Sequence, residues 1–178
     1  DGISATLQDR EYITNSTLVN TGGVTQSIVV TNKNLAGSTR SLKFVSGSYL
    51  KQVDGYDFDF GTGNLTFEAW INPTGISGTQ YIFDCRRGNA TTGLNIRMVD
   101  QTLRVFDHTT NIILSGNVFT SANTWYHIAV VRNEGVMSAY VNGTQAGSNA
   151  SNSTDFGYGP CFIGADRNGS SGFIGNID

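Results

Sequence analysis

The chain has 178 residues and a formal net charge of −3, and its 22 glycines, 7 tyrosines and 10 phenylalanines contrast with 2 prolines and 14% charged residues. This composition is typical of one turn-rich all-β domain that is large enough to bury a core. It lacks the basic charge that binds phosphate backbones, and no apolar run approaches the ~20 residues that span a bilayer, so we expect no nucleic acid and no membrane insertion.

The first 40 residues alternate weakly, and their elements are the hardest to place. Short strands are expected at residues 11–13 and 27–31, with polar connectors at residues 20–23 and 31–39. We expect this segment to complete the fold, because an uncovered sheet edge beside central strands would invite aggregation. A separate contact arm is the alternative.

Clear alternation begins after residue 40. Leu42 and Phe44 share one face of a strand, which we expect to continue through residues 49–53 before an Asp-rich loop. The next strand, at residues 65–73, has an apolar face that includes Phe67 and Ile71, with Glu68 and Trp70 on the opposite face, and it should be central. Pro73 ends it because proline has no amide hydrogen to donate.

Residues 81–87 form a third predicted strand, and a hairpin follows it. If Asp100 and Gln101 form the turn, Arg97 lies directly opposite Arg104 on the face away from the core. Two like charges placed in this way are destabilising unless negative charge lies near them. The pairs expected on the core side are Met98 with Leu103 and Ile96 with Val105.

The clearest element is a hairpin over residues 124–147. Its first strand is apolar on both faces and should be central, and Asn142-Gly143 supplies the two positive-φ positions of a type I′ turn. Counting ten or so short strands, we predict an all-β, two-sheet antiparallel β-sandwich or jelly roll, formed by residues 1–178 as a single domain.

The two cysteines, Cys85 and Cys161, each lie in a short apolar run. Two are too few for a disulfide framework, and small buried thiols are the favoured interpretation. A single disulfide between them is the alternative. Neither histidine has the spacing of a metal ligand.

Six stretches occur in a succession that is typical of a known family: SLKFVSGSYLKQV, FDFGTGNLTFEAWINPT, NTWYHIAVVRN, SAYVNGTQAGS, CFIGADRN and FIGNID. Residues 41–178, which contain them, resemble the laminin-G-like jelly roll of the concanavalin A-like lectin/glucanase superfamily. The resemblance implies two antiparallel sheets, one concave, with a ligand or partner often met by the loops at one rim. The Asn-, Thr-, Ser- and Gly-rich composition is most similar to that of bacteriophage fibre and decoration modules. Relatives usually continue beyond the stretch that corresponds to FIGNID and complete an edge strand there. We therefore expect that this chain is a segment of a longer polypeptide, or that a partner chain supplies the strand.

Some relatives are glycosidases, which place two carboxylates about 5 to 9.5 Å apart across the scissile bond. The only glutamates here are Glu11, Glu68 and Glu134, and no strand carries a closely spaced set of acids. We therefore expect no enzyme activity and no cofactor, with a glycosidase as a distant alternative.

Calcium binding is a separate possibility, because carboxylates and loop carbonyls are the ligands that calcium takes. The nearby acids are Asp54, Asp57 and Asp59, and Asp166 with Asn168 lies in a later loop that could approach them. Asp and Gly build such turns without a metal, so no calcium site is assigned.

The candidate ligand-binding residues are four arginines: Arg86, Arg87, Arg97 and Arg104. On one sheet face, their planar guanidinium groups would suit an anion or an acidic sugar. The simpler alternative is a solvated face on which the arginines pair with Asp84 or Asp107.

We therefore predict a non-catalytic binding or adhesion module of a larger virion fibre, decoration or cell-surface protein. It would be extracellular or on a virion surface, would present rim loops to a glycan or protein partner, and would form a homo-oligomer or larger assembly. The alternative is a purely structural assembly subunit that binds no sugar.

Overall fold

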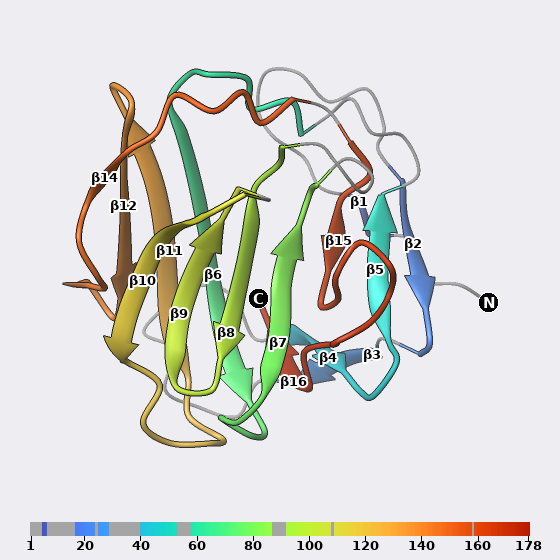
Figure 1. Cartoon of the computed structure of the whole chain (residues 1–178). Coiled ribbons are helices and arrows are strands. Elements are labelled where there is room, and N and C mark those ends of the chain that lie inside the picture. The colour runs from blue at the N-terminus through green and yellow to red at the C-terminus, as the bar shows by residue number, and fades with distance from the viewer. Residues whose placement is uncertain are drawn as a thin grey trace.

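The computed structural model of the chain is a sandwich of two antiparallel β-sheets (Figure 1). It describes residues 5–6, 17–23, 25–28, 40–52, 58–86, 92–107, 109–157 and 159–178. Every pairing between named strands is antiparallel, and none of the described residues is helical. The predicted all-β sandwich is confirmed. A search of the described residues for a helix able to cross a membrane finds none.

Sheet A is the front layer in Figure 1 and has the strand order β1-β2-β5-β15-β7-β8-β9-β10. Strands distant in the chain become neighbours in it, since β15 pairs with both β5 and β7. Its strands are β1 (Ala5–Thr6), β2 (Thr17–Thr21), β5 (Tyr49–Gln52), β7 (Thr79–Asp84), β8 (Asn95–Val99), β9 (Thr102–Phe106), β10 (Asn111–Asn117) and β15 (Phe162–Ile163).

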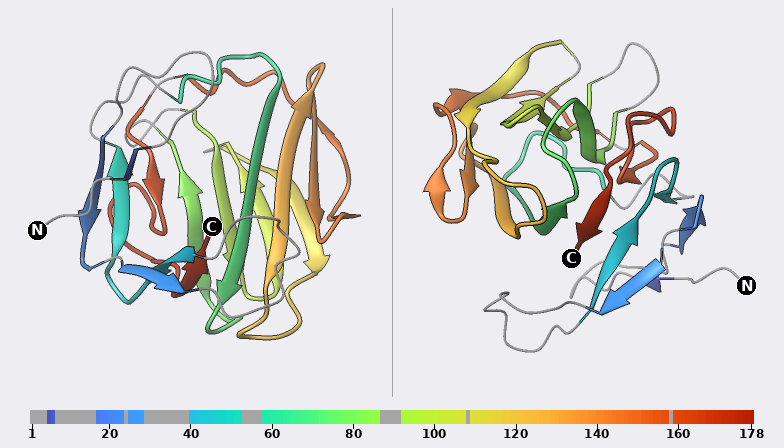
Figure 2. Two further views of the ribbon diagram at one scale, coloured as in Figure 1. Left: turned by 180° about the vertical axis from the view of Figure 1, so that it is seen from behind. Right: turned by 90° about the horizontal axis from the view of Figure 1, so that it is seen from below.

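Sheet B is the layer behind, seen in front in the left view of Figure 2, and has the order β13-β12-β11-β6-β16-β4-β3, with β14 paired to β12. As predicted, β6 and β11 are central and pair with each other. Its strands are β3 (Thr25–Ile28), β4 (Arg40–Phe44), β6 (Leu65–Pro73), β11 (Tyr126–Asn133), β12 (Val136–Val141), β13 (Thr144–Gln145), β14 (Ala150–Ser151) and β16 (Gly175–Ile177).

Both predicted hairpins form, and the one over β8 and β9 has the expected register. Arg97 pairs with Arg104 across β8 and β9, and Asp100 in the turn has a φ of 51°. Asn142 and Gly143 have φ values of 50° and 77°, as the type I′ turn requires.

The core lies between the two sheets, where their apolar faces meet. Sheet B contributes Phe44, Ile71 and Ile128, and sheet A contributes Ile96 and Met98, all of them fully buried. For β8, the alternation read from the sequence predicts correctly that Ile96 and Met98 are inside.

Arg132, at the end of β11, is fully buried and anchors the loops that close one end of the sandwich. Its Nε donates to the Gly63 carbonyl at 2.6 Å, and its Nη2 donates to the Gly61 carbonyl at 2.7 Å. Its Nη1 donates to the Thr154 carbonyl at 2.7 Å, and its guanidinium lies 4.7 Å from the centre of the Phe156 ring. Burial lowers the pKa of Arg132, opposed by the charge of Asp155.

Cys85 and Cys161 form a disulfide across 76 residues of sequence, so the favoured interpretation of two free thiols is wrong. Their expected burial is correct, since each is 1% exposed. Cys85 follows β7 and Cys161 precedes β15, and these strands are neighbours in sheet A. The sequence pattern missed the bond because nothing local predicts that β15 lies beside β7.

The first strand after residue 40 does not continue as expected. β4 ends at Phe44 in sheet B, a turn closed by Ser48 follows, and β5 begins at Tyr49 in sheet A. The segment therefore crosses between the layers.

The last strand, β16, is an internal strand between β4 and β6. Gly175 begins it with a φ of 146°, and a Cβ at this position would lie 2.1 Å from the carbonyl oxygen of Asn72. Only glycine fits so close to the neighbouring backbone.

The early region is richer in strands than expected. Asn20 and Thr21 belong to β2 rather than to a connector, and β3 overlaps only the start of the strand predicted at residues 27–31. The strand predicted at residues 11–13 lies outside the described residues. The described chain has 16 strands, more than the predicted ten or so, because several have only two residues.

Candidate functional site

An arginine-rich cluster lies on the outer face of sheet A, over β7, β8 and β9. Ile96 and Met98 of β8 enter the core, so the alternation turns Asn95 and Arg97 outward. Strand pairing aligns Tyr81, Arg97 and Arg104 in one row and Asp84, Asn95 and Phe106 in the next. We define the arginine face as Tyr81, Arg86, Arg97, Arg104, Phe106 and Arg167, together with the buried Asp84 and Asn95.

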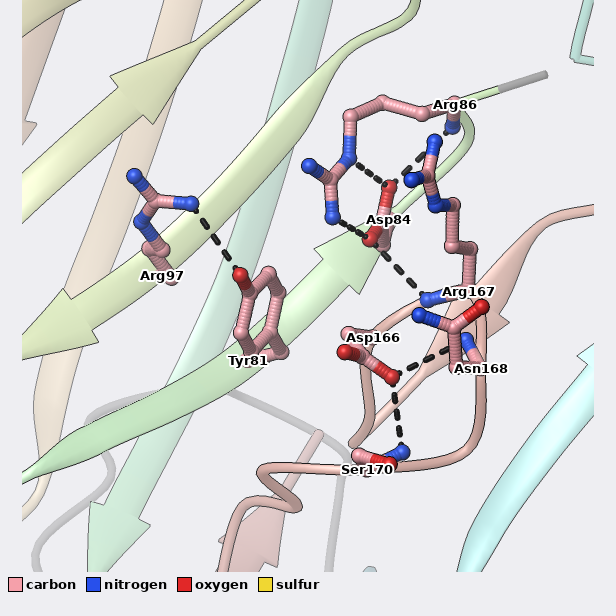
Figure 3. A network of polar contacts seen from close by, with 8 residues as sticks. All are labelled: Tyr81, Asp84, Arg86, Arg97, Asp166, Arg167, Asn168 and Ser170. Carbon is pink, nitrogen blue, oxygen red and sulfur yellow. Dashed lines mark hydrogen bonds and ion pairs between the residues drawn. The ribbon is translucent and has the colours of Figure 1, made fainter. Parts of the chain in front are cut away.

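Asp84 is fully buried and holds one side of this face together (Figure 3). Its Oδ1 accepts hydrogen bonds from Nε of Arg86 at 2.8 Å and from the Arg86 backbone amide at 3.1 Å. Its Oδ2 accepts one from the backbone amide of Arg167 at 3.0 Å and forms an ion pair with Nη2 of Arg86. Burial alone would lower the pKa of Arg86, but the hydrogen bonds and charge of Asp84 outweigh burial and raise it. Arg86 is thus a fixed cation.

Arg97 is held mainly by aromatic rings. Its Nη1 donates to the hydroxyl of Tyr81 at 3.1 Å, and its guanidinium carbon lies 4.6 Å from the centre of the Phe106 ring. The guanidinium of Arg86 lies 5.8 Å from that ring and 5.6 Å from the ring of Tyr81. Two cations therefore share the same two rings, an arrangement that is attractive when the cation lies over the ring face.

No carboxylate pairs with Arg97 or Arg104 among the residues that the structure describes. Arg104 makes only a long hydrogen bond from its Nε to the Thr102 hydroxyl, at 3.4 Å. Of the alternatives considered, pairing with Asp84 is found for Arg86, and none of Arg86, Arg97 and Arg104 pairs with Asp107.

The carboxylate of Asp107 is instead occupied by Thr109, Thr110 and Thr154. Burial alone would raise the pKa of Asp107, but these hydrogen bonds outweigh burial and lower it. Asp107 therefore stabilises the neighbouring loops and does not compensate the arginines.

Hydrogen-bonding capacity is left unused within the arginine face. The side-chain nitrogen and oxygen of Asn95 are both buried without a partner, and so is Nε of Arg97. Buried polar groups in folded proteins are nearly always bonded to protein, water or ligand, so each such group requires an explanation. Here three such atoms lie on one strand, on the same face.

The structure brings three of the four predicted site residues together: Arg86, Arg97 and Arg104. Arg87 lies outside the described residues. Sequence reasoning missed the two rings and Asn95, although the predicted register already placed Phe106 and Asn95 on the face of Arg97. It also missed Arg167, which comes from a distant loop with no local signal.

The family is shown by comparison with known sequences. The family model described as "Concanavalin A-like lectin/glucanases superfamily" (Laminin_G_3) matches residues 46–178. The chain belongs to this superfamily. No curated protein matches the sequence.

Several solved structures share this fold with the chain at low sequence identity. Domain 4 of AbnA, a GH43 extracellular arabinanase from Geobacillus stearothermophilus, solved with arabinotriose, has a TM-score of 0.68 at 15% identity over 91% of this chain and 79% of that domain chain. A botulinum neurotoxin type C chain, from a toxin whose uptake into cells depends on interaction with two ganglioside molecules, has a TM-score of 0.62 at 13% identity over 99% of this chain and 45% of the toxin chain. The binding domain of botulinum neurotoxin DC, in complex with SialylT, has a TM-score of 0.59 at 13% identity over 92% of this chain and 40% of that chain. The chain thus spans less than half of the two toxin chains.

The two described glutamates do not lie at the arginine face. Glu68 is exposed on the outer face of sheet B, and Glu134 lies in the turn between β11 and β12. Glu11 lies outside the described residues.

The residues considered for calcium serve as turn acceptors where the structure describes them. Asp59 accepts from the Gly61 amide, and Asp166 accepts from the amides of Asn168 and Ser170 (Figure 3). Asp54 and Asp57 lie outside the described residues. Within the described part of the chain, no three potential metal ligands lie together.

Proposed function

We propose that the chain is a non-catalytic glycan-binding module and that its arginine face binds an anionic sugar. The observation that carries this proposal is the positive charge of Arg97 and Arg104, two half-buried guanidinium groups that pair with no carboxylate of the described residues. A glycan carboxylate or sulfate supplies acceptor oxygens and a negative charge for these two groups.

The chemistry of the face suits a charged sugar better than a simple ion. A guanidinium group can donate two parallel hydrogen bonds to one carboxylate, and such charge-assisted bonds are stronger than neutral ones. The partly buried Tyr81 and Phe106 add apolar surface for the carbon-bound hydrogens of the sugar ring. Asp84 holds Arg86 in place before the ligand arrives, which reduces the entropy lost on binding.

The comparisons support a binding role, because two similar domains were solved with arabinotriose and with SialylT. A third similar chain belongs to a toxin whose cell entry depends on interaction with two ganglioside molecules. A non-catalytic role is supported by the positions of Glu68 and Glu134, which do not form a facing pair of carboxylates. A test for reducing-sugar release on the same glycans checks this part of the proposal.

We further propose that the module is one part of a longer extracellular chain. The Cys85–Cys161 disulfide supports an oxidising compartment. A place in a virion fibre or decoration protein, and a homo-oligomeric state, remain predictions from the resemblance. Light scattering and intact mass measurement on the native assembly will test both, because a free monomer of about this mass contradicts them.

The glycan proposal is tested by calorimetry with three probes: oligogalacturonate, a heparin oligosaccharide and neutral arabinotriose. We expect at least one anionic probe to bind through the arginine face, and its affinity to fall as salt rises. Arg97→Met should weaken this binding at least tenfold. Lys43→Met, which removes an exposed cation from the other sheet, is the matched control. Equal loss in both variants, or no anionic binding, would overturn the proposal.

A further inference from the structure

Sheet B lies on the other side of the sandwich from sheet A (Figure 2), and its outer face carries a second cluster of functional groups. Trp70 of β6 pairs with His127 of β11, and their ring centroids are 5.2 Å apart. In the adjacent row, Ala129 of β11 lies between Glu68 of β6 and Tyr140 of β12. We define the aromatic face as Trp70, His127, Tyr140, Glu68 and Ala129.

The alternation of the strands fixes the outward direction of this cluster. The neighbours of Trp70 and Tyr140 along the chain, among them Ala69, Ile71 and Ala139, belong to the core. Trp70, His127 and Tyr140 are themselves only half-buried, and Glu68 is exposed. The rings are therefore not part of the interior packing of the sandwich.

The polar atoms of the aromatic face are not used within the described part of the chain. Neither the indole N–H of Trp70, the ring nitrogens of His127, the carboxylate of Glu68 nor the hydroxyl of Tyr140 makes a hydrogen bond or ion pair there. Other tyrosines differ, since the hydroxyl of Tyr126 bonds to the backbone of residues 120 and 121. The unused groups of four side chains thus gather at one place.

Ala129 has the smallest side chain of this face and lies between Glu68 and Tyr140. It is 7% exposed, it is absent from the core cluster, and its neighbours in the surrounding rows are larger. A flat ligand lying over its methyl group would have Trp70 and His127 on one side, Tyr140 on another and Glu68 opposite Tyr140.

We propose that the aromatic face is a second binding site, which takes an uncharged glycan. A sugar ring presents a face of C–H groups that packs on an aromatic ring, and hydroxyl groups at its edge that need donors and acceptors. Trp70 and Tyr140 supply the rings, and Glu68 and His127 supply the polar groups. The negative charge of Glu68 selects against anionic sugars, so the ligand class differs from that of the arginine face.

A protein partner is the competing occupant, and the composition of the face disfavours it. The cores of protein interfaces are depleted in glutamate and serine, yet Glu68 belongs to this face and Ser138 lies in the next row, opposite Val131. Of the exposed large hydrophobic residues, only Val136 lies on β6, β11 or β12, and it is at the hairpin end.

Fluorescence provides the direct test, because the chain has only 2 tryptophans. In a Trp125→Phe background, Trp70 is the sole emitter. We expect its emission to shift to shorter wavelength on titration with at least one of cellohexaose, xylohexaose, mannohexaose and arabinotriose. Tyr140→Ala and Glu68→Gln should each weaken that binding at least tenfold, whereas Lys43→Met should leave it unchanged.

Each other outcome overturns the proposal. These are the absence of a shift with any of the four probes, binding that survives both substitutions, or a dimer that buries Trp70. Glu68 is exposed, so Glu68→Gln remains informative even if Tyr140→Ala fails to fold. The test of the aromatic face does not depend on the outcome for the arginine face, because the neutral and the charged probes are titrated independently.

Discussion

Arg132 and Arg97 are both strand arginines, but they use their guanidinium groups in opposite ways. Arg132 is fully buried and donates to the carbonyls of Gly61, Gly63 and Thr154. Arg97 is half-buried, donates to the hydroxyl of Tyr81, and leaves its Nε without a partner. Each also lies over an aromatic ring, so ring contact does not distinguish them.

What distinguishes these two arginines is how many of their donors the chain itself satisfies. A guanidinium group whose donors are all bonded to the chain is part of the fold, and its loss leaves buried carbonyls without partners. A guanidinium group with donors to spare can bind something else. The comparison therefore predicts a large effect on stability at Arg132 and a large effect on binding at Arg97.

Arg132→Met should have the largest effect on stability. It leaves the carbonyls of Gly61, Gly63 and Thr154 without their donor, so we expect a loss of about 3 kcal/mol or more in the free energy of unfolding. Urea unfolding followed by tryptophan fluorescence measures this loss. A cost below about 1 kcal/mol would contradict a structural role for Arg132.

Removal of the disulfide should rank next. Cys85→Ala with Cys161→Ala removes a crosslink across 76 residues, for which we expect a loss of roughly 2 to 4 kcal/mol. This double variant also tests whether the arginine face depends on the crosslink, because Cys85 directly precedes Arg86. Binding of the anionic probe by the folded double variant shows whether Asp84 alone positions Arg86.

Asp107 should make the stability of the loops around Arg132 depend on pH. It accepts a hydrogen bond from the hydroxyl of Thr154, whose carbonyl accepts one from Arg132. Because the pKa of Asp107 is lowered in the folded state, its contribution is present above about pH 4, the unfolded value, and is lost as pH falls through the folded pKa.

Asp107→Asn should therefore cost roughly 1.5 kcal/mol at pH 7, and this cost should shrink as the pH falls through the lowered pKa and the wild-type carboxyl becomes protonated. Urea unfolding at a series of pH values between 2 and 7 measures the difference. Parallel curves for the two proteins would mean that Asp107 does not provide this dependence.

The fold and part of the arginine face could be predicted from local sequence. Alternation and turn residues give the register in which Arg97 faces Arg104, because both depend only on neighbouring residues. The same alternation places Arg132 on the face of Ile128 and Val130, but both faces of that strand are apolar, so the pattern does not tell which one is inside.

The disulfide and the rest of the arginine face depend on contacts between segments that are distant in the sequence. The partnership of Cys85 with Cys161, and that of Asp84 with the amide of Arg167, both require β15 to insert between β5 and β7. No local pattern predicts which strand enters a sheet at that position, so neither contact could be foreseen. The unused groups of Asn95 were equally hidden, because only the completed packing shows that they lack partners.

Arg97→Met should have the smallest effect on stability and thereby gives the sharpest test of the comparison. The loss of its contact with Phe106 costs about 0.5 to 1 kcal/mol, and the relief of repulsion from Arg104 offsets part of this cost. The methionine side chain retains apolar packing on Phe106. We therefore expect a change below about 1 kcal/mol in urea unfolding, together with at least tenfold weaker binding of the anionic probe. If Arg97→Met instead destabilises the chain as much as Arg132→Met does, then unused donors do not mark a binding residue, and Arg97 belongs to the fold.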